Sequence, residues 1–184
     1  MSRSLNFTML AALVLLLGGC KAVGNAFEET PNIGPCPAAL VLWDAARKVE
    51  FKGPESYKNI GFTAEVLGAR SFCKYSGTKP ITADLDVALA FGRGPAATTD
   101  TKLYHYFVAV TRKNSVVIDK QNFAVKVHFP KGKKIIKRTE HFGKIVIPRA
   151  KANTSGTNFE IIVGLDLTPE ELKFARSGKK FRLN

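Results

Sequence analysis

The stretch ITADLDVALAF, residues 81–91, has the clearest alternation of side chains in the chain. Its odd-numbered positions are all apolar, whereas Thr82, Asp84 and Asp86 stand at even-numbered ones. A period of two places successive side chains on opposite faces of a β-strand. One row should therefore pack into a core while the other meets solvent. We expect a long strand in the middle of a sheet.

Weaker patterns of the same kind lie on both sides of this stretch. Residues 58–67 alternate like a half-buried strand, and residues 71–75 resume an extended pattern after Gly68. Residues 104–112 are apolar on both faces, which is typical of a strand that is covered or lies inside a sheet. Other extended segments are predicted at residues 116–120, 123–129, 142–147 and 159–167.

Near the carboxyl end the pattern changes to that of a helix. Thr168 suits the N-cap, Pro169 suits the first helical position, and Glu171 completes a capping box before Gly178 ends the helix. With about seven to eight strands and one short helix, the chain is predicted to be all-β. We expect an antiparallel sandwich that resembles immunoglobulin or fibronectin type III modules in strand number.

The apolar run at residues 38–46 is too brief to separate a buried strand from a short helix. Trp43, within it, is expected to pack in the core. Cys36 and Cys73 fall in this folded part of the chain, and in an oxidising compartment their pairing is the expected outcome. A pair of reactive thiols is the alternative, which the lack of a Cys-x-x-Cys motif disfavours.

The amino-terminal segment has a different character. Arg3 precedes an apolar segment, residues 7–17, that has signal-peptide length and is short for a bilayer span. The sequence LGGC at residues 17–20 resembles the lipobox of bacterial lipoprotein precursors. This resemblance implies that residues 1–19 are a signal peptide and that Cys20 is acylated, with palmitate among its acyl groups. An ordinary secretory signal with an incidental cysteine is the alternative.

The same resemblance bears on location and organisation. Lys21 stands where retention in the inner membrane often uses Asp, so we expect a lipid anchor in the outer membrane, facing the periplasm. Residues 20–36 are rich in Gly and Pro and are predicted to be a flexible tether, which leaves residues 37–184 as one β-sandwich domain. The sequence NFEIIVGLDLTPEEL, residues 158–172, is loosely similar to small alphaproteobacterial lipoproteins of uncharacterised function.

The formal net charge of the chain is +13, and only one basic residue, Arg3, precedes Cys20. The densest basic segment follows Phe129 and contains Lys131, Lys133, Lys134, Lys137 and Arg138. Such a segment favours anionic surfaces, here lipopolysaccharide, anionic lipid or peptidoglycan, although a basic edge that blocks strand pairing is equally expected. Nucleic acid is not an expected partner, because Phe129 and Phe142 fall in inward rows and cannot stack on bases.

No cluster of catalytic residues emerges from the sequence. His105, His128 and His141 have no histidine or cysteine at metal-ligand spacing, so neither a metal nor a cofactor is predicted. Asp84 and Asp86 share one strand face and could serve acid–base or calcium chemistry, but such rows more often form the wet face of a sheet.

These observations favour a non-enzymatic envelope lipoprotein that acts as a binding or assembly module in the periplasm. Envelope proteins, lipopolysaccharide and peptidoglycan are the candidate partners. A carrier or sensor of a small or lipidic ligand is an alternative and would need an apolar cavity between the sheets. An envelope enzyme of unrecognised type is another. It would need Asp84 or Asp86 to meet a histidine in a concave site.

Overall fold

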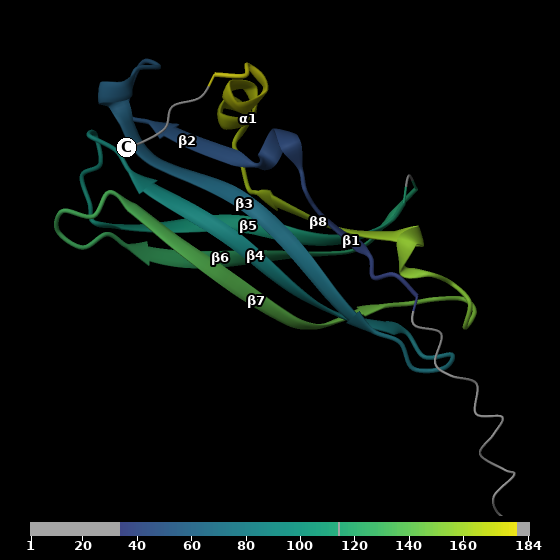
Figure 1. The fold of residues 1–184 in the computed structure, drawn as a ribbon. Helices are drawn as coiled ribbons and strands as arrows, with labels where there is room; N and C mark the ends of the chain where they lie inside the picture. Colours follow the sequence, from purple (N-terminus) through teal and green to yellow (C-terminus); the bar gives the residue numbers. More distant parts are fainter. Residues whose placement is uncertain (1–33, 114, 180–184) are drawn as a thin grey trace, which may run out of the picture. The chain divides into compact units, whose positions relative to one another are not determined.

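A computed structural model of the chain describes residues 34–113 and 115–179. The described strands are β1 (Ala38–Val41), β2 (Arg47–Phe51), β3 (Ile60–Lys74), β4 (Ile81–Arg93), β5 (Thr101–Arg112), β6 (Val117–His128), β7 (Ile135–Ile147) and β8 (Phe159–Leu165). One helix, α1 (Pro169–Arg176), and three short 3-10 turns, Trp43–Ala45, Tyr57–Asn59 and Gly156–Asn158, complete the described elements. The strands form two four-stranded sheets, which confirms the predicted β-sandwich (Figure 1).

The two sheets have the orders β1-β8-β5-β6 and β2-β3-β4-β7. The pairing of β1 with β8 is parallel, and the other described pairings are antiparallel. β5 lies between β8 and β6, as expected of a strand that is apolar on both faces. β5 and β6 follow each other in the chain and pair as a hairpin.

The predicted central strand is β4, which lies between β3 and β7. Its inward side chains are almost completely buried, from Ile81 at 0% exposure to Phe91 at 1%, whereas Thr82 and Asp84 are exposed. Rings from the other sheet pack onto this row, and the Tyr104 ring centre lies 4.7 Å from that of Phe91. Burial of a large apolar side chain contributes about 1.5–3 kcal/mol, so this row is a principal source of stability.

Trp43 is not a core residue, contrary to the prediction. Its exposure is 75%, because the chain turns from one sheet to the other at Trp43–Ala45. The turn buries the small side chains of Ala45 and Ala46 and leaves the indole outside. Residues 38–46 thus contain both a short strand, β1, and a 3-10 turn, the two structures that the sequence left open.

Strand boundaries differ from the predictions in several places. β2 was not predicted, because its sequence RKVEF is mostly charged, as suits a strand at the edge of a sheet. The segments predicted at 58–67 and 71–75 form one strand, β3, with a register shift between Val66 and Gly68. Likewise 116–120 and 123–129 largely merge in β6, and 142–147 is the end of the longer β7.

α1 begins with the predicted capping box. The Thr168 hydroxyl accepts a hydrogen bond from the backbone N–H of Glu171 at 3.3 Å, and the Glu171 carboxylate accepts one from the Thr168 N–H at 2.8 Å. Gly178 follows the helix with φ of 73°, a conformation that favours glycine. Phe174 packs edge-on against Phe51 of β2 with ring centres 5.2 Å apart. This contact fixes the helix beside β2 (Figure 1).

Glu50 of β2 links the two sheets near α1. Its carboxylate contacts the ammonium groups of Lys102, in β5, and Lys52, the latter at 2.8 Å. Burial alone would raise the pKa of Glu50, but hydrogen bonds and charge from Lys102 and Lys52 outweigh it and hold the pKa below its usual value. The ionised carboxylate is therefore the form that stabilises the fold.

This pKa predicts how stability depends on pH. Because the pKa of Glu50 is lower in the folded chain, its contribution is present above the usual glutamate pKa and is lost as pH falls through the folded pKa. We expect Glu50→Gln to lower the free energy of unfolding by about 1 kcal/mol at pH 7, a typical value for a half-buried ion pair. The deficit should be smaller at pH 3, which lies below the usual glutamate pKa. Urea unfolding at both pH values measures it, with Glu160→Gln as the control; equal deficits at both would contradict the assignment.

Candidate functional site

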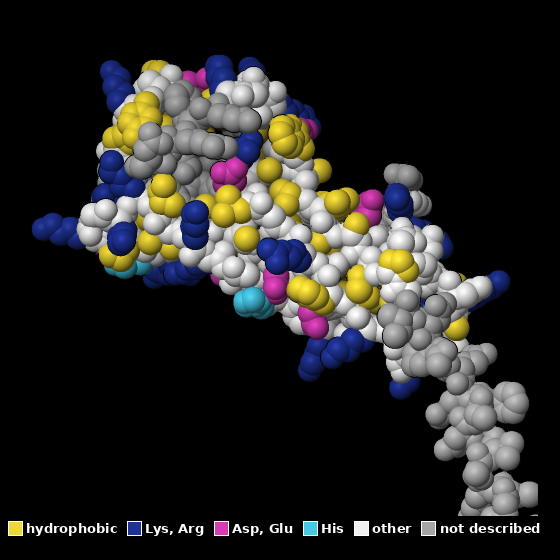
Figure 2. All heavy atoms as spheres, in the orientation of Figure 1, with side chains coloured by type: hydrophobic (Ala, Val, Ile, Leu, Met, Phe, Trp, Pro, Cys, Tyr) yellow, Lys and Arg dark blue, Asp and Glu magenta, His cyan; other side chains and the backbone are white. Residues whose placement is uncertain are grey.

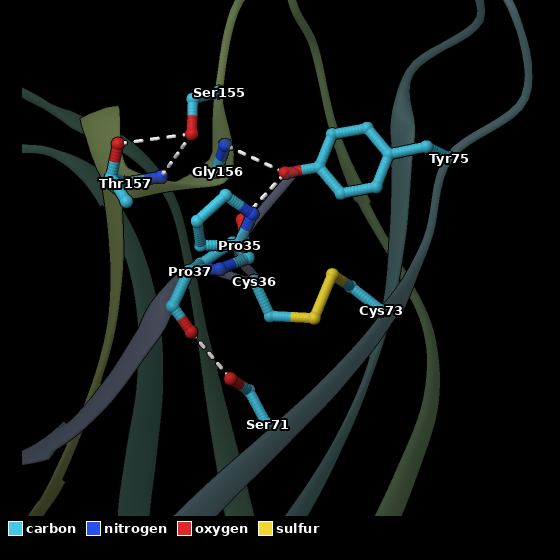
Figure 3. Close-up of a disulfide and its surroundings, with 9 residues drawn as sticks. All are labelled: Pro35, Cys36, Pro37, Ser71, Cys73, Tyr75, Ser155, Gly156 and Thr157. Carbon is cyan, nitrogen blue, oxygen red and sulfur yellow. Dashed lines mark hydrogen bonds between the residues drawn. A yellow bond between two sulfur atoms is a disulfide. The ribbon is translucent and has the colours of Figure 1, made fainter. Parts of the chain in front are cut away.

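The segment that enters the sandwich, Gly34–Pro37, is fastened to the end of β3. Cys36 and Cys73 form a disulfide with their Cα atoms 5.5 Å apart, so the predicted pairing is confirmed (Figure 3). The cysteines are 37 positions apart in sequence. Closing a loop of this size disfavours the unfolded chain by about 4 kcal/mol in the entropic description of disulfides.

Hydrogen bonds reinforce the disulfide on both sides. The Tyr75 hydroxyl donates to the carbonyl of Pro35 at 2.6 Å and accepts from the N–H of Gly156 at 2.7 Å, while the Ser71 hydroxyl donates to the carbonyl of Pro37 (Figure 3). A Cβ at position 156 would lie 2.4 Å from the Pro35 carbonyl oxygen, so only glycine permits this approach. The entry segment is therefore held by a covalent bond and a packed polar network.

The features predicted before this entry segment lie outside the described residues. They are Cys20, the signal peptide at 1–19 and most of the tether at 20–36. Within the described ranges, no helix is long and apolar enough to cross a membrane.

The titratable residues considered from the sequence are separated, with one exception. Asp86 Oδ1 lies 2.7 Å from His141 Nδ1 across β4 and β7, on an outer face where the two side chains are 37% and 72% exposed. Figure 2 shows a histidine beside an acidic side chain on open surface. Among the described residues no serine, threonine or cysteine bonds to His141, so this pair lacks the third partner and the concave setting of a hydrolytic site.

The other candidates are likewise spread over the surface. Asp84 accepts a hydrogen bond from the Lys144 N–H at 3.3 Å, and His128 lies beside Asp100 at 3.7 Å. His105 is exposed on the opposite sheet. No group of three His, Cys, Asp or Glu side chains in the described part could hold a metal ion.

A hollow of about 380 Å³ lies on the outer face of the β2-β3-β4-β7 sheet, next to α1. We call it the α1 groove. Strand register arranges its floor in two rows across the sheet: Arg47, Glu65, Ala90 and Lys137 in one, and Val49, Thr63, Gly92 and Ile135 in the other. In both rows the residue on the central strand β4 is small. The middle of the floor is therefore recessed between larger side chains.

The wall of the α1 groove is held by contacts between α1 and β2. Phe174 is 6% exposed and packs in a small satellite core with Val49 and Ile60. Glu171 forms an ion pair with Lys48 at 2.8 Å, with both side chains largely buried. Such a pair costs much to break because it leaves a buried charge without a partner. The wall is thus part of the folded framework.

Trp43 stands at the rim of the same groove. The Arg47 guanidinium lies 5.9 Å from the centre of its ring and is itself paired with Glu65 at 2.8 Å. A cation over the face of tryptophan is attracted by the ring electrons. Arg47 therefore links the floor of the groove to an otherwise open indole, and Trp43, expected in the core, is instead a surface feature.

The basic segment predicted from sequence divides in two. Lys131, Lys133 and Lys134 precede β7 in a turn, which we call the basic turn, while Lys137 and Arg138 are in β7, an edge strand. Lys137 lines the α1 groove. Arg138 turns away and donates to the backbone carbonyl of Lys126 in β6 at 3.2 Å, so it protects an edge of the other sheet. The interpretation as a basic edge fits Arg138, and binding of this segment to anionic surfaces stays a prediction.

Comparisons with known proteins add no relative to this description. No family model, no curated protein and no solved structure matches the chain. The case for a function therefore depends on the entry segment and on the α1 groove.

The entry segment generates a prediction on stability. Replacing both cysteines by alanine should lower the free energy of unfolding by about 2–4 kcal/mol, because the loop between them is no longer closed in the unfolded state. Urea unfolding with and without a thiol reductant measures this. Reductant should destabilise the natural chain and leave the double variant unchanged. An equal response of both proteins would show that the bridge does not contribute.

Proposed function

We propose that the chain is an exported lipoprotein of the bacterial cell envelope whose β-sandwich is a non-enzymatic binding module. Cys20 carries the lipid, and the protein is anchored in the outer membrane, facing the periplasm. The lipobox at residues 17–20 and the charge at Lys21 support this cellular location. The Cys36–Cys73 disulfide fits it, because disulfides persist in oxidising compartments.

The α1 groove is the observation that carries the binding role. Ligand sites are concave and combine apolar surface with a few placed polar groups. The α1 groove has a recessed floor, a wall held by the ion pair of Lys48 with Glu171, and an exposed tryptophan at its rim. The interior offers less support for the alternative of a carrier with a ligand between the sheets. Leu85, Val127 and Ile161 each have 0% exposure there, and core side chains from both sheets contact one another.

The placement of the groove suits a tethered binder. The chain enters at Cys36–Cys73, and β3 runs from this end to the groove at Thr63. Ten residues of extended strand separate Cys73 from Thr63, about 33 Å at the usual rise. A tether from Cys20 would therefore join the sandwich at the end of β3 that is far from the groove.

The lipid anchor is tested by metabolic labelling. Cells that express the full chain and are fed a palmitate analogue should incorporate it into the protein, and Cys20→Ser should abolish incorporation, since this cysteine is the acylated residue. The Cys36→Ser variant controls for loss of any cysteine and should keep the label. If Cys20→Ser is labelled as strongly as the natural chain, the lipoprotein assignment is wrong.

The binding role is tested by crosslinking in living cells. A photoreactive phenylalanine analogue at Thr63, in the groove, should give an adduct that survives boiling in detergent. The same analogue at Asn122, exposed on the outer face of β6, should not. Gel mobility of the affinity-tagged chain after irradiation provides the measurement. Absence of any adduct from Thr63, or equal adducts from both positions, would contradict a partner in the groove.

A further inference from the structure

The charges of the α1 groove select the sign of its occupant. The groove is lined by five basic side chains and one carboxylate, that of Glu65. Four of the basic groups have acidic partners: Arg47 with Glu65, Lys48 with Glu171, Arg176 with Asp44 and Lys179 with Glu55. Lys137 has no acidic partner among the described residues. It continues directly from the basic turn, so the open side of the groove presents unbalanced positive charge.

The lining also distinguishes between kinds of anion. One floor row carries the charged groups of Arg47, Glu65 and Lys137 beside Ala90. The other carries the Thr63 hydroxyl between Val49 and Gly92 and ends at Ile135. An acyl chain would need a continuous apolar lining, because it leaves polar groups without hydrogen-bond partners. A sugar ring would match the mixture, since its faces are apolar and its edges carry hydroxyls, which can donate to a carboxylate such as Glu65 and accept from Thr63 or Lys137.

Trp43 adds the surface that a sugar ring would contact. Its indole is 75% exposed at the groove rim, and the Arg47 guanidinium lies 5.9 Å from the ring centre. The face of an aromatic ring carries partial negative charge and attracts the weakly positive C–H groups of a saturated ring. Large exposed aromatic side chains beside arginine are also typical of residues that dominate binding energy.

The middle of the groove floor is formed by small residues. On β4, Ala90 lies between Glu65 of β3 and Lys137 of β7. In the next row, Gly92 lies between Thr63 of β3 and Ile135 of β7. The central strand therefore lets a rigid ring approach the sheet, while the flanking side chains reach its edges.

We propose that the α1 groove binds peptidoglycan, with sugar rings over Ala90 and Gly92 and against Trp43, and with carboxylates of the polymer at Lys137 and the basic turn. This inference rests on the proposed function and names the partner of the same site. Within the envelope, peptidoglycan is the glycan polymer that combines sugar rings with many carboxylates. The polymer also lies away from the membrane. The groove lies likewise away from the Cys36–Cys73 disulfide, where the tether joins the sandwich.

The test is co-sedimentation with purified peptidoglycan sacculi, using the full lipidated chain in detergent solution. The natural chain should pellet with sacculi at low salt. It should pellet less at about 0.5 M salt, because salt screens the attraction between exposed charges. Lys137→Glu should weaken the apparent affinity for sacculi at least about fivefold, which corresponds to about 1 kcal/mol, because the unpaired charge is reversed. Ala90→Leu should also weaken binding, because the larger side chain fills the middle of the α1 groove floor.

Matched variants on the other sheet separate binding from general effects. Lys126→Glu and Ala124→Leu make the same changes at exposed positions of β6 and should pellet like the natural chain. Circular dichroism melting shows that each variant is folded. Sacculi whose carboxylates have been converted to amides should lose the protein, which tests the charge of the polymer directly.

The inference is overturned if the groove variants pellet like their β6 controls, or if the natural chain pellets no better than an unrelated basic protein. Capture by lipopolysaccharide vesicles with no capture by sacculi would equally overturn it, as would a discrete protein adduct from Thr63 without sedimentation. In the last case the groove still has a partner, so the proposed function survives. Absence of any adduct from Thr63 contradicts the proposed function as well.

Discussion

The fold depends on the complete burial of one side of β4. Its inward row contacts β5 and the rest of the opposite sheet, so the two sheets can pack only in the register that this strand imposes. A shift of one residue would bring Asp84 and Asp86 into the core, where unpaired carboxylates are far more costly than any packing gain. Because the inward row is fixed, the outward row is fixed too. The surface features of this sheet are therefore consequences of the core.

The outward row of β4 changes character along its length. Asp84 and Asp86 come first, and Ala88, Ala90 and Gly92 follow. At the acidic half, partners on β7 such as His141 satisfy the carboxylates on open surface. At the small half, α1 packs against β2 at one edge of the sheet, and the α1 groove lies between α1 and β7. One strand thus provides the centre of the core and the recessed floor of the only surface region for which we propose a partner.

Much of this arrangement could be predicted from the sequence, because period-two alternation is a local signal. It located β4, the interior position of β5 and the capping box of α1. It failed where long-range contacts decide: charged β2 becomes a strand only by pairing with β3, and Trp43 is exposed only because the chain crosses between sheets there. The groove was missed for the same reason. A row of small residues on β4 was visible, but α1 as its wall depends on Phe174 meeting Phe51 and Val49.

The high net charge is a weaker guide to function than the distribution of ion pairs. Among the described residues, many basic groups are paired with carboxylates or hold backbone carbonyls, as Arg149 does at Lys79 and Ala152. Paired surface charges contribute little net attraction to a partner, because each added anion must compete with an existing one. Like most lysines of the described residues, Lys137 and those of the basic turn have no ion pair, but Lys137 also lines a shaped hollow. A positive balance spread over the whole surface would give unselective adhesion, whereas unbalanced charge beside a shaped hollow gives a reason for one polymer to bind in one place.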